Sequence, residues 1–149
     1  MENKNENPDI ILLKDIERSV SLHADTLIAI IGKTEDDGQK SLLSAMLDTC
    51  EGFAEKAGQR LQESKTETQA PGILEKLPSE LSVFMSTLTD HSPSKIAGLV
   101  IENAVVNVSE FKEKIRKADE AGANIENIRL AGDVLAFHEE TINKMRRYL

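Results

Sequence analysis

Apolar residues recur along most of this chain at alternating steps of three and four, which is the spacing of one face of an α-helix. The first stripe follows Asn7-Pro8-Asp9, where a capping side chain, a proline and an acid suit a helix start, and it ends at Gly32. Its members are Leu13, Ile16, Val20, His23, Leu27 and Ile30. The pattern predicts a long amphipathic helix.

A second stripe of the same period begins after a short polar turn. Thr34 is the predicted cap of this helix, with acids at positions 35 to 37. The stripe consists of Leu43, Met46, Cys50, Phe53, Ala57 and Leu61. Because the turn is short, the two helices are predicted to pack as an antiparallel hairpin.

Residues 64–92 interrupt this regularity and are predicted to be a long connection. The segment is polar and without period as far as Gly72, and a short amphipathic run follows Pro78. Ser92 and Pro93 then start a third long helix, with the stripe Ala97, Ile101, Ala104, Val108, Phe111, Ile115 and Ala118. Gly122 ends that helix and Asn124 caps the next, with the stripe Ile128, Ala131, Leu135, His138, Ile142, Met145 and Leu149.

The four stripes predict an all-α fold, an antiparallel four-helix bundle that forms one domain over residues 1–149 with a disordered N-terminus at residues 1–7. A helix of 25 residues is about 37 Å long, a distance that residues 64–92 are long enough to cross. A long crossover between the second and third long helices is therefore allowed. The alternative is plain up-down-up-down connectivity, with the short helix packed on an end or side.

Composition narrows the range of partners. Aromatic residues make up 3% of the 149 residues and Trp is absent, so the core is predicted to be aliphatic. The net charge of −8 opposes binding to nucleic acid or anionic lipid. Cys50 is the single cysteine, and there is neither a secretory signal nor an apolar stretch of about 18 to 20 residues that would cross a bilayer. A cytoplasmic protein without a membrane partner is predicted.

The helix layout resembles the ferritin-like superfamily. The resemblance includes a first turn with the sequence Gly32-Lys33-Thr34-Glu35-Asp36-Asp37 and a last helix that contains Leu135-Ala136-Phe137-His138-Glu139-Glu140. The layout is similar to small bacterial members of unknown function. The resemblance implies a di-metal centre at mid-height, built from a glutamate on each of two helices and Glu-x-x-His on the other two. This chain has no Glu-x-x-His, so only His138 and Glu102 remain as inherited ligands.

The stripes themselves offer a second donor set. His23 and His138 lie halfway along their predicted helices, and Cys50 and Asn107 lie at similar depth. Imidazole and thiolate favour zinc or copper, whereas iron follows only from the superfamily's centre. A transition metal held by His23, Cys50 and His138, with water or Asn107 at a fourth position, is one interpretation. The other is that both histidines are interior groups hydrogen-bonded to neighbours, and both are expected to be less exposed than His91.

Two functions follow from these interpretations. The first is a non-catalytic ferritin-like bundle that acts as a homodimer or binds a protein partner through spare apolar surface, unless ordinary packing within the chain buries that surface. The residues that would supply this surface are Val83, Phe84, Met85, Val100, Val105 and Val106. The second is a metal-binding or oxidoreductase bundle with a reduced site around His138.

Overall fold

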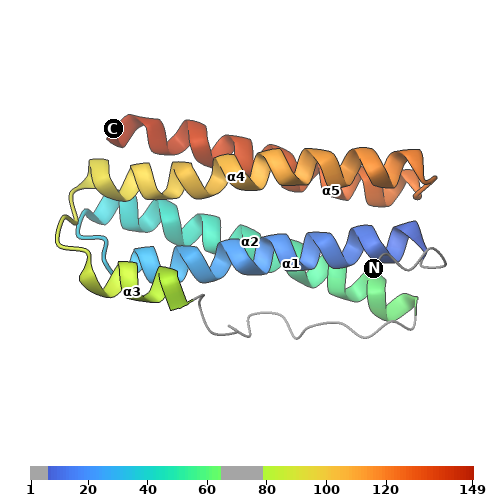
Figure 1. Ribbon diagram of the computed structural model, residues 1–149, viewed down its shortest axis with the longest axis horizontal. Coiled ribbons are helices and arrows are strands. Elements are labelled where there is room, and N and C mark those ends of the chain that lie inside the picture. The colour runs from blue at the N-terminus through green and yellow to red at the C-terminus, as the bar shows by residue number, and fades with distance from the viewer. Residues whose placement is uncertain (1–6, 65–78) are drawn as a thin grey trace.

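The computed structural model describes residues 7–64 and 79–149, and within them the protein is all-helical, with no strand (Figure 1). This confirms the predicted all-α class. The predicted disordered N-terminus falls outside the described residues except for Asn7, and so do residues 65–78 of the predicted connection. The elements are α1 (Pro8–Ile31), α2 (Asp37–Glu63), α3 (Ser79–Thr87), α4 (Pro93–Glu120), α5 (Ile125–Met145) and the 3-10 helix η1 (Arg146–Tyr148).

Side-chain caps begin the long helices, mostly where the sequence predicts them. Asn7 accepts a hydrogen bond from Asp9 N at 2.8 Å, and Asn124 accepts one from Glu126 N at 2.9 Å. The predicted cap of α2 is wrong. Asp36 caps this helix, and the Thr34 hydroxyl donates instead to Ile30 O at 2.8 Å. The cap of α2 therefore lies two residues later than predicted, because the Thr34 hydroxyl pairs with a carbonyl at the end of α1.

The long helices lie side by side, and polar contacts at their ends fix their directions (Figure 1). The Gln39 side chain donates to Pro93 O at 2.9 Å, which places the starts of α2 and α4 together. At the opposite end, Arg60 donates to Asn127 Oδ1 at 2.8 Å, and Asp9 accepts from Asn124 N at 2.7 Å. Therefore α1 and α2 are antiparallel, α4 and α5 are antiparallel, and α2 and α4 run in the same direction.

The core is aliphatic and centres on α1, which packs against α2, α4 and α5. All six predicted stripe residues of α1 are buried. The predicted face of α5 is rotated, because Val134 and Phe137 are buried whereas Leu135 is only partly buried. Leu149 is wrong as a core residue, since it lies past the end of α5 and is 67% exposed. None of the described helices is long and apolar enough to span a membrane.

Two glycines provide a matched test of the turn between α4 and α5. Gly122 has φ +85°, a conformation strained for other residues, whereas Gly132 lies in the open on α5. We expect Gly122→Ala to lower the free energy of unfolding by about 1 to 2 kcal/mol. Gly132→Ala should raise it by up to about 1 kcal/mol, because alanine is the better helix former. Urea unfolding measures both changes, and effects of the same sign would contradict this account of the turn.

Candidate functional site

His23 of α1 and His138 of α5 form a buried pair in the interior of the protein. Their side chains are 1% and 0% exposed, and the ring centroids lie 5.0 Å apart at an interplanar angle of 82°. The ring of Phe137 lies against both, at 5.9 Å from His23 and 5.4 Å from His138. The side chain of His91 is 25% exposed, so the prediction that it is the most accessible histidine is confirmed.

Asn103 of α4 sets the tautomer of His23. The amide oxygen of Asn103 lies 2.8 Å from His23 Nδ1 and also accepts from Asn107 Nδ2 at 3.2 Å. An amide oxygen only accepts, so Nδ1 of His23 carries the proton and donates. The other ring nitrogen, Nε2, is left with a lone pair.

His138 is held more loosely. Its Nε2 lies 3.5 Å from the hydroxyl oxygen of Ser19, which belongs to α1. Its Nδ1, like Nε2 of His23, is buried without a hydrogen-bond partner. We call His23, His138, Asn103, Asn107 and Ser19 the polar layer. It couples α1 to both α4 and α5 and contains two unsatisfied ring nitrogens.

Burial keeps both rings neutral. Desolvation lowers the pKa of His23, with the hydrogen bond to Asn103 acting in the opposite direction. Desolvation lowers the pKa of His138 to about 3, and the neighbouring His23 adds to this shift. At neutral pH, therefore, neither His23 Nε2 nor His138 Nδ1 gains a proton that could form a hydrogen bond.

The other two predicted metal ligands do not join the pair. Glu102 is exposed on α4. Cys50 is buried in α2, where burial raises the pKa of its thiol to about 12, so it is neutral as well. Within residues 7–64 and 79–149, no three side chains of His, Cys, Asp or Glu gather into a metal-binding group. A carboxylate-bridged di-metal centre does not fit this donor set, and metal binding by the histidines stays a prediction.

Sequence reasoning missed two members of the polar layer, Asn103 and Ser19. Each lies four residues before a residue that it identified, Asn107 in α4 and His23 in α1, and residues four apart share a helix face. That spacing was the available signal. Side-chain direction between neighbouring helices, which determines the hydrogen bonds, leaves no mark in a single sequence.

A surface groove between α1 and α4 reaches the polar layer. It has a volume of about 630 Å³, and Ser19 and Asn107 are both part of its wall. Basic side chains (Arg18, Lys114) and acidic ones (Asp15, Glu110) also line the groove, and Lys114 forms an ion pair with Asp15 at 3.5 Å. The groove thus connects solvent to residues that contact both histidines.

Comparison with protein-family models, with curated proteins and with solved structures found no match to this chain. The description of the site therefore rests on its own residues and their geometry. The resemblance to the ferritin-like superfamily remains a prediction from the sequence.

The buried pair should make the fold sensitive to acid. Because the folded-state pKa of each ring lies below the unfolded value of 6.5, the unfolded state takes up protons first as the pH falls. The contribution of the neutral rings to the free energy of unfolding is therefore complete above pH 6.5 and is lost progressively below it. We expect the free energy of unfolding to fall by about 1 kcal/mol per pH unit for each ring as the solution is acidified.

Denaturant unfolding between pH 7 and 5, where fewer carboxylates titrate, measures this slope. His138→Gln should reduce it, and His91→Gln is the matched control that should leave it unchanged. An identical slope in the wild type and in His138→Gln would refute the assignment of the acid sensitivity to the buried pair.

Proposed function

We propose that the protein is a non-catalytic, ferritin-like four-helix bundle that acts as a homodimer. The helix directions support the ferritin-like part of the proposal. Since α2 and α4 run in the same direction, the chain leaves α2 at one end and enters α4 at the other, as a long crossover requires (Figure 1). The dimer part is supported by one surface of α4.

This surface, the α4 outer face, carries two adjacent exposed valines. Val105 is 50% exposed and Val106 is 53% exposed, whereas Val100 and Met85, which the sequence suggested as further spare apolar surface, are buried. Exposed β-branched residues in mid-helix lose side-chain freedom without gaining burial. A partner that covers them supplies that burial. The face consists of Lys95, Gly98, Glu102, Val105, Val106, Ser109 and Glu113.

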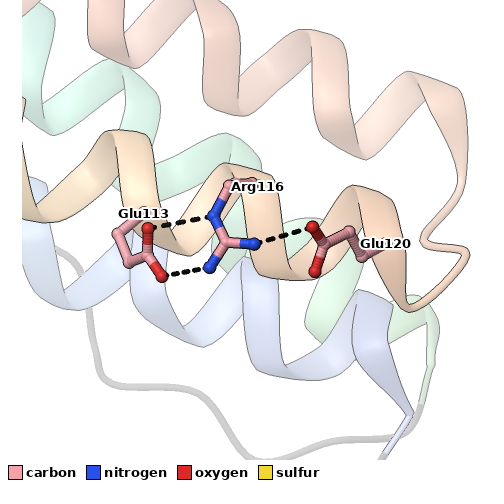
Figure 2. A network of polar contacts seen from close by, with 3 residues as sticks. All are labelled: Glu113, Arg116 and Glu120. Carbon is pink, nitrogen blue, oxygen red and sulfur yellow. Dashed lines mark hydrogen bonds and ion pairs between the residues drawn. The ribbon is translucent and has the colours of Figure 1, made fainter.

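Its charges favour a second copy of the same chain. If two α4 helices pack antiparallel about a two-fold axis level with residue 104, next to Val105, Lys95 of each copy lies opposite Glu113 of the other. Figure 2 shows that Glu113 also belongs to a network in which Arg116 bridges to Glu113 and to Glu120. This trio carries one net negative charge, so the end of the face that holds it remains complementary to the end that holds Lys95.

Light scattering at micromolar concentration tests the dimer. The wild type should have the mass of two chains of 16.5 kDa each. Two buried lysines without partners are costly, so Val105→Lys/Val106→Lys should dissociate the dimer with at least a tenfold weaker association. Circular dichroism should remain helical, because both positions are exposed in the single chain.

Val83→Lys is the matched control. Val83 lies on α3, is 62% exposed and offers the same change of side chain on another surface. It should leave the dimer intact. A monomeric wild type would refute the homodimer, and dissociation by Val83→Lys but not by the α4 variant would assign the interface to α3 instead.

A further inference from the structure

Each ring of the histidine pair has one nitrogen without a hydrogen-bond partner. His23 Nε2 and His138 Nδ1 are both buried and neither has a hydrogen-bond partner among the described residues. A buried polar atom left unpaired loses its hydrogen bonds to water and gains none in return. The pair therefore loses stability unless something binds to these two atoms.

The tautomers determine what can bind. Asn103 holds the proton of His23 on Nδ1, so Nε2 presents a lone pair. The Ser19 hydroxyl lies 3.5 Å from Nε2 of His138, and in the tautomer in which its oxygen accepts from Nε2, Nδ1 of His138 presents a lone pair as well. Histidines that bind metals commonly donate their second ring N–H to an oxygen in this way.

We propose that His23 Nε2 and His138 Nδ1 bind one soft monovalent cation, Cu(I). This inference rests on the polar layer and not on the proposed dimer. It also differs from a carboxylate-bridged centre, because the two donors are neutral nitrogens and the site holds a single ion.

The charge of the site favours a monovalent ion. The two donors are uncharged, and no third acidic, thiol or imidazole group joins them within the described residues. The cost of moving an ion from water into a protein interior scales with the square of its charge. A divalent ion would meet about four times this cost without a carboxylate to offset it, and imidazole is a donor that suits copper.

The spacing of the rings fits one shared ion. With metal to nitrogen distances of about 2 Å, each ring centroid lies about 3 Å from the ion, so two such rings are separated by at most about 6 Å. The observed centroid distance is 5.0 Å. The groove between α1 and α4, whose wall includes Ser19 and Asn107, offers a route from solvent.

Competition with a chromophoric Cu(I) chelator, using the full chain under anaerobic reducing conditions, tests the proposal. We expect one equivalent of Cu(I) per chain, and at least a hundredfold loss of affinity in His23→Gln and in His138→Gln. His91→Gln and Cys50→Ala should bind as the wild type does. Unchanged binding in both buried-histidine variants, or loss of binding in Cys50→Ala, would overturn the proposal.

The pH dependence separates the two donor types without any substitution. Binding to neutral imidazoles releases no proton, so the affinity should be the same at pH 7 and pH 8. The pKa of the Cys50 thiol is raised to about 12, so binding as a thiolate would release a proton and strengthen about tenfold over this interval. A tenfold change would therefore contradict a site made of histidines.

Nitrogen NMR of the wild type keeps the proposal testable if the glutamine variants do not fold. Loading ¹⁵N-labelled protein with Cu(I) should shift His23 Nε2 and His138 Nδ1, and Zn(II) in place of Cu(I) should shift neither. A shift of His91 alone, or tighter binding of Zn(II) at the pair, would refute the assignment of a monovalent ion. Because these spectra are independent of the mass of the protein, they separate failure of the cation site from failure of the dimer.

Discussion

Burial of the apolar surface of α1 is the interaction on which the rest of the structure depends. This helix packs against α2, α4 and α5, and Ile16, Val20 and Leu27 have no exposed surface at all. Each such side chain contributes about 1.5 to 3 kcal/mol when it is buried completely. The two hairpins would otherwise be separate pairs of helices, each with an uncovered apolar face. Because α1 contacts both members of the second hairpin, it joins the two pairs into one core.

Apolar contacts alone do not fix how far one helix is displaced along another, because aliphatic side chains tolerate many similar arrangements. The polar layer removes this freedom. The hydrogen bond from His23 to Asn103 determines the position of α1 along α4, and the contact between Ser19 and His138 relates α1 to α5. A shift by one helical turn would leave these groups buried and unpaired. The layer therefore acts on register, while the aliphatic residues provide most of the stability.

The sequence predicts this fold well where a single helix determines the outcome. The stripe of α1 and the cap at Asn124 are correct because periodicity and capping are local properties. The face of α5 is less accurate, because Phe137 is buried against His23 of α1 and Phe53 of α2, and such contacts between helices are not encoded in the periodicity of one helix. The halfway positions of His23 and His138 along their helices correctly predict that the two rings lie together. The same criterion does not bring Cys50 to the pair, because residues at the same height in a bundle can face different parts of the interior.

The composition of the polar layer is itself an argument that it binds something. Two leucines in place of the histidines would fill a similar volume and would leave no ring nitrogens to desolvate. Register does not require the extra nitrogens, because His23 Nδ1 and His138 Nε2 already make the contacts to Asn103 and Ser19. The two remaining atoms, His23 Nε2 and His138 Nδ1, are buried without a partner in the described part of the chain, and Ser19 and Asn107 of the groove wall contact the two rings. These two nitrogens do not stabilise the bundle, whereas the binding of a cation would use both of them.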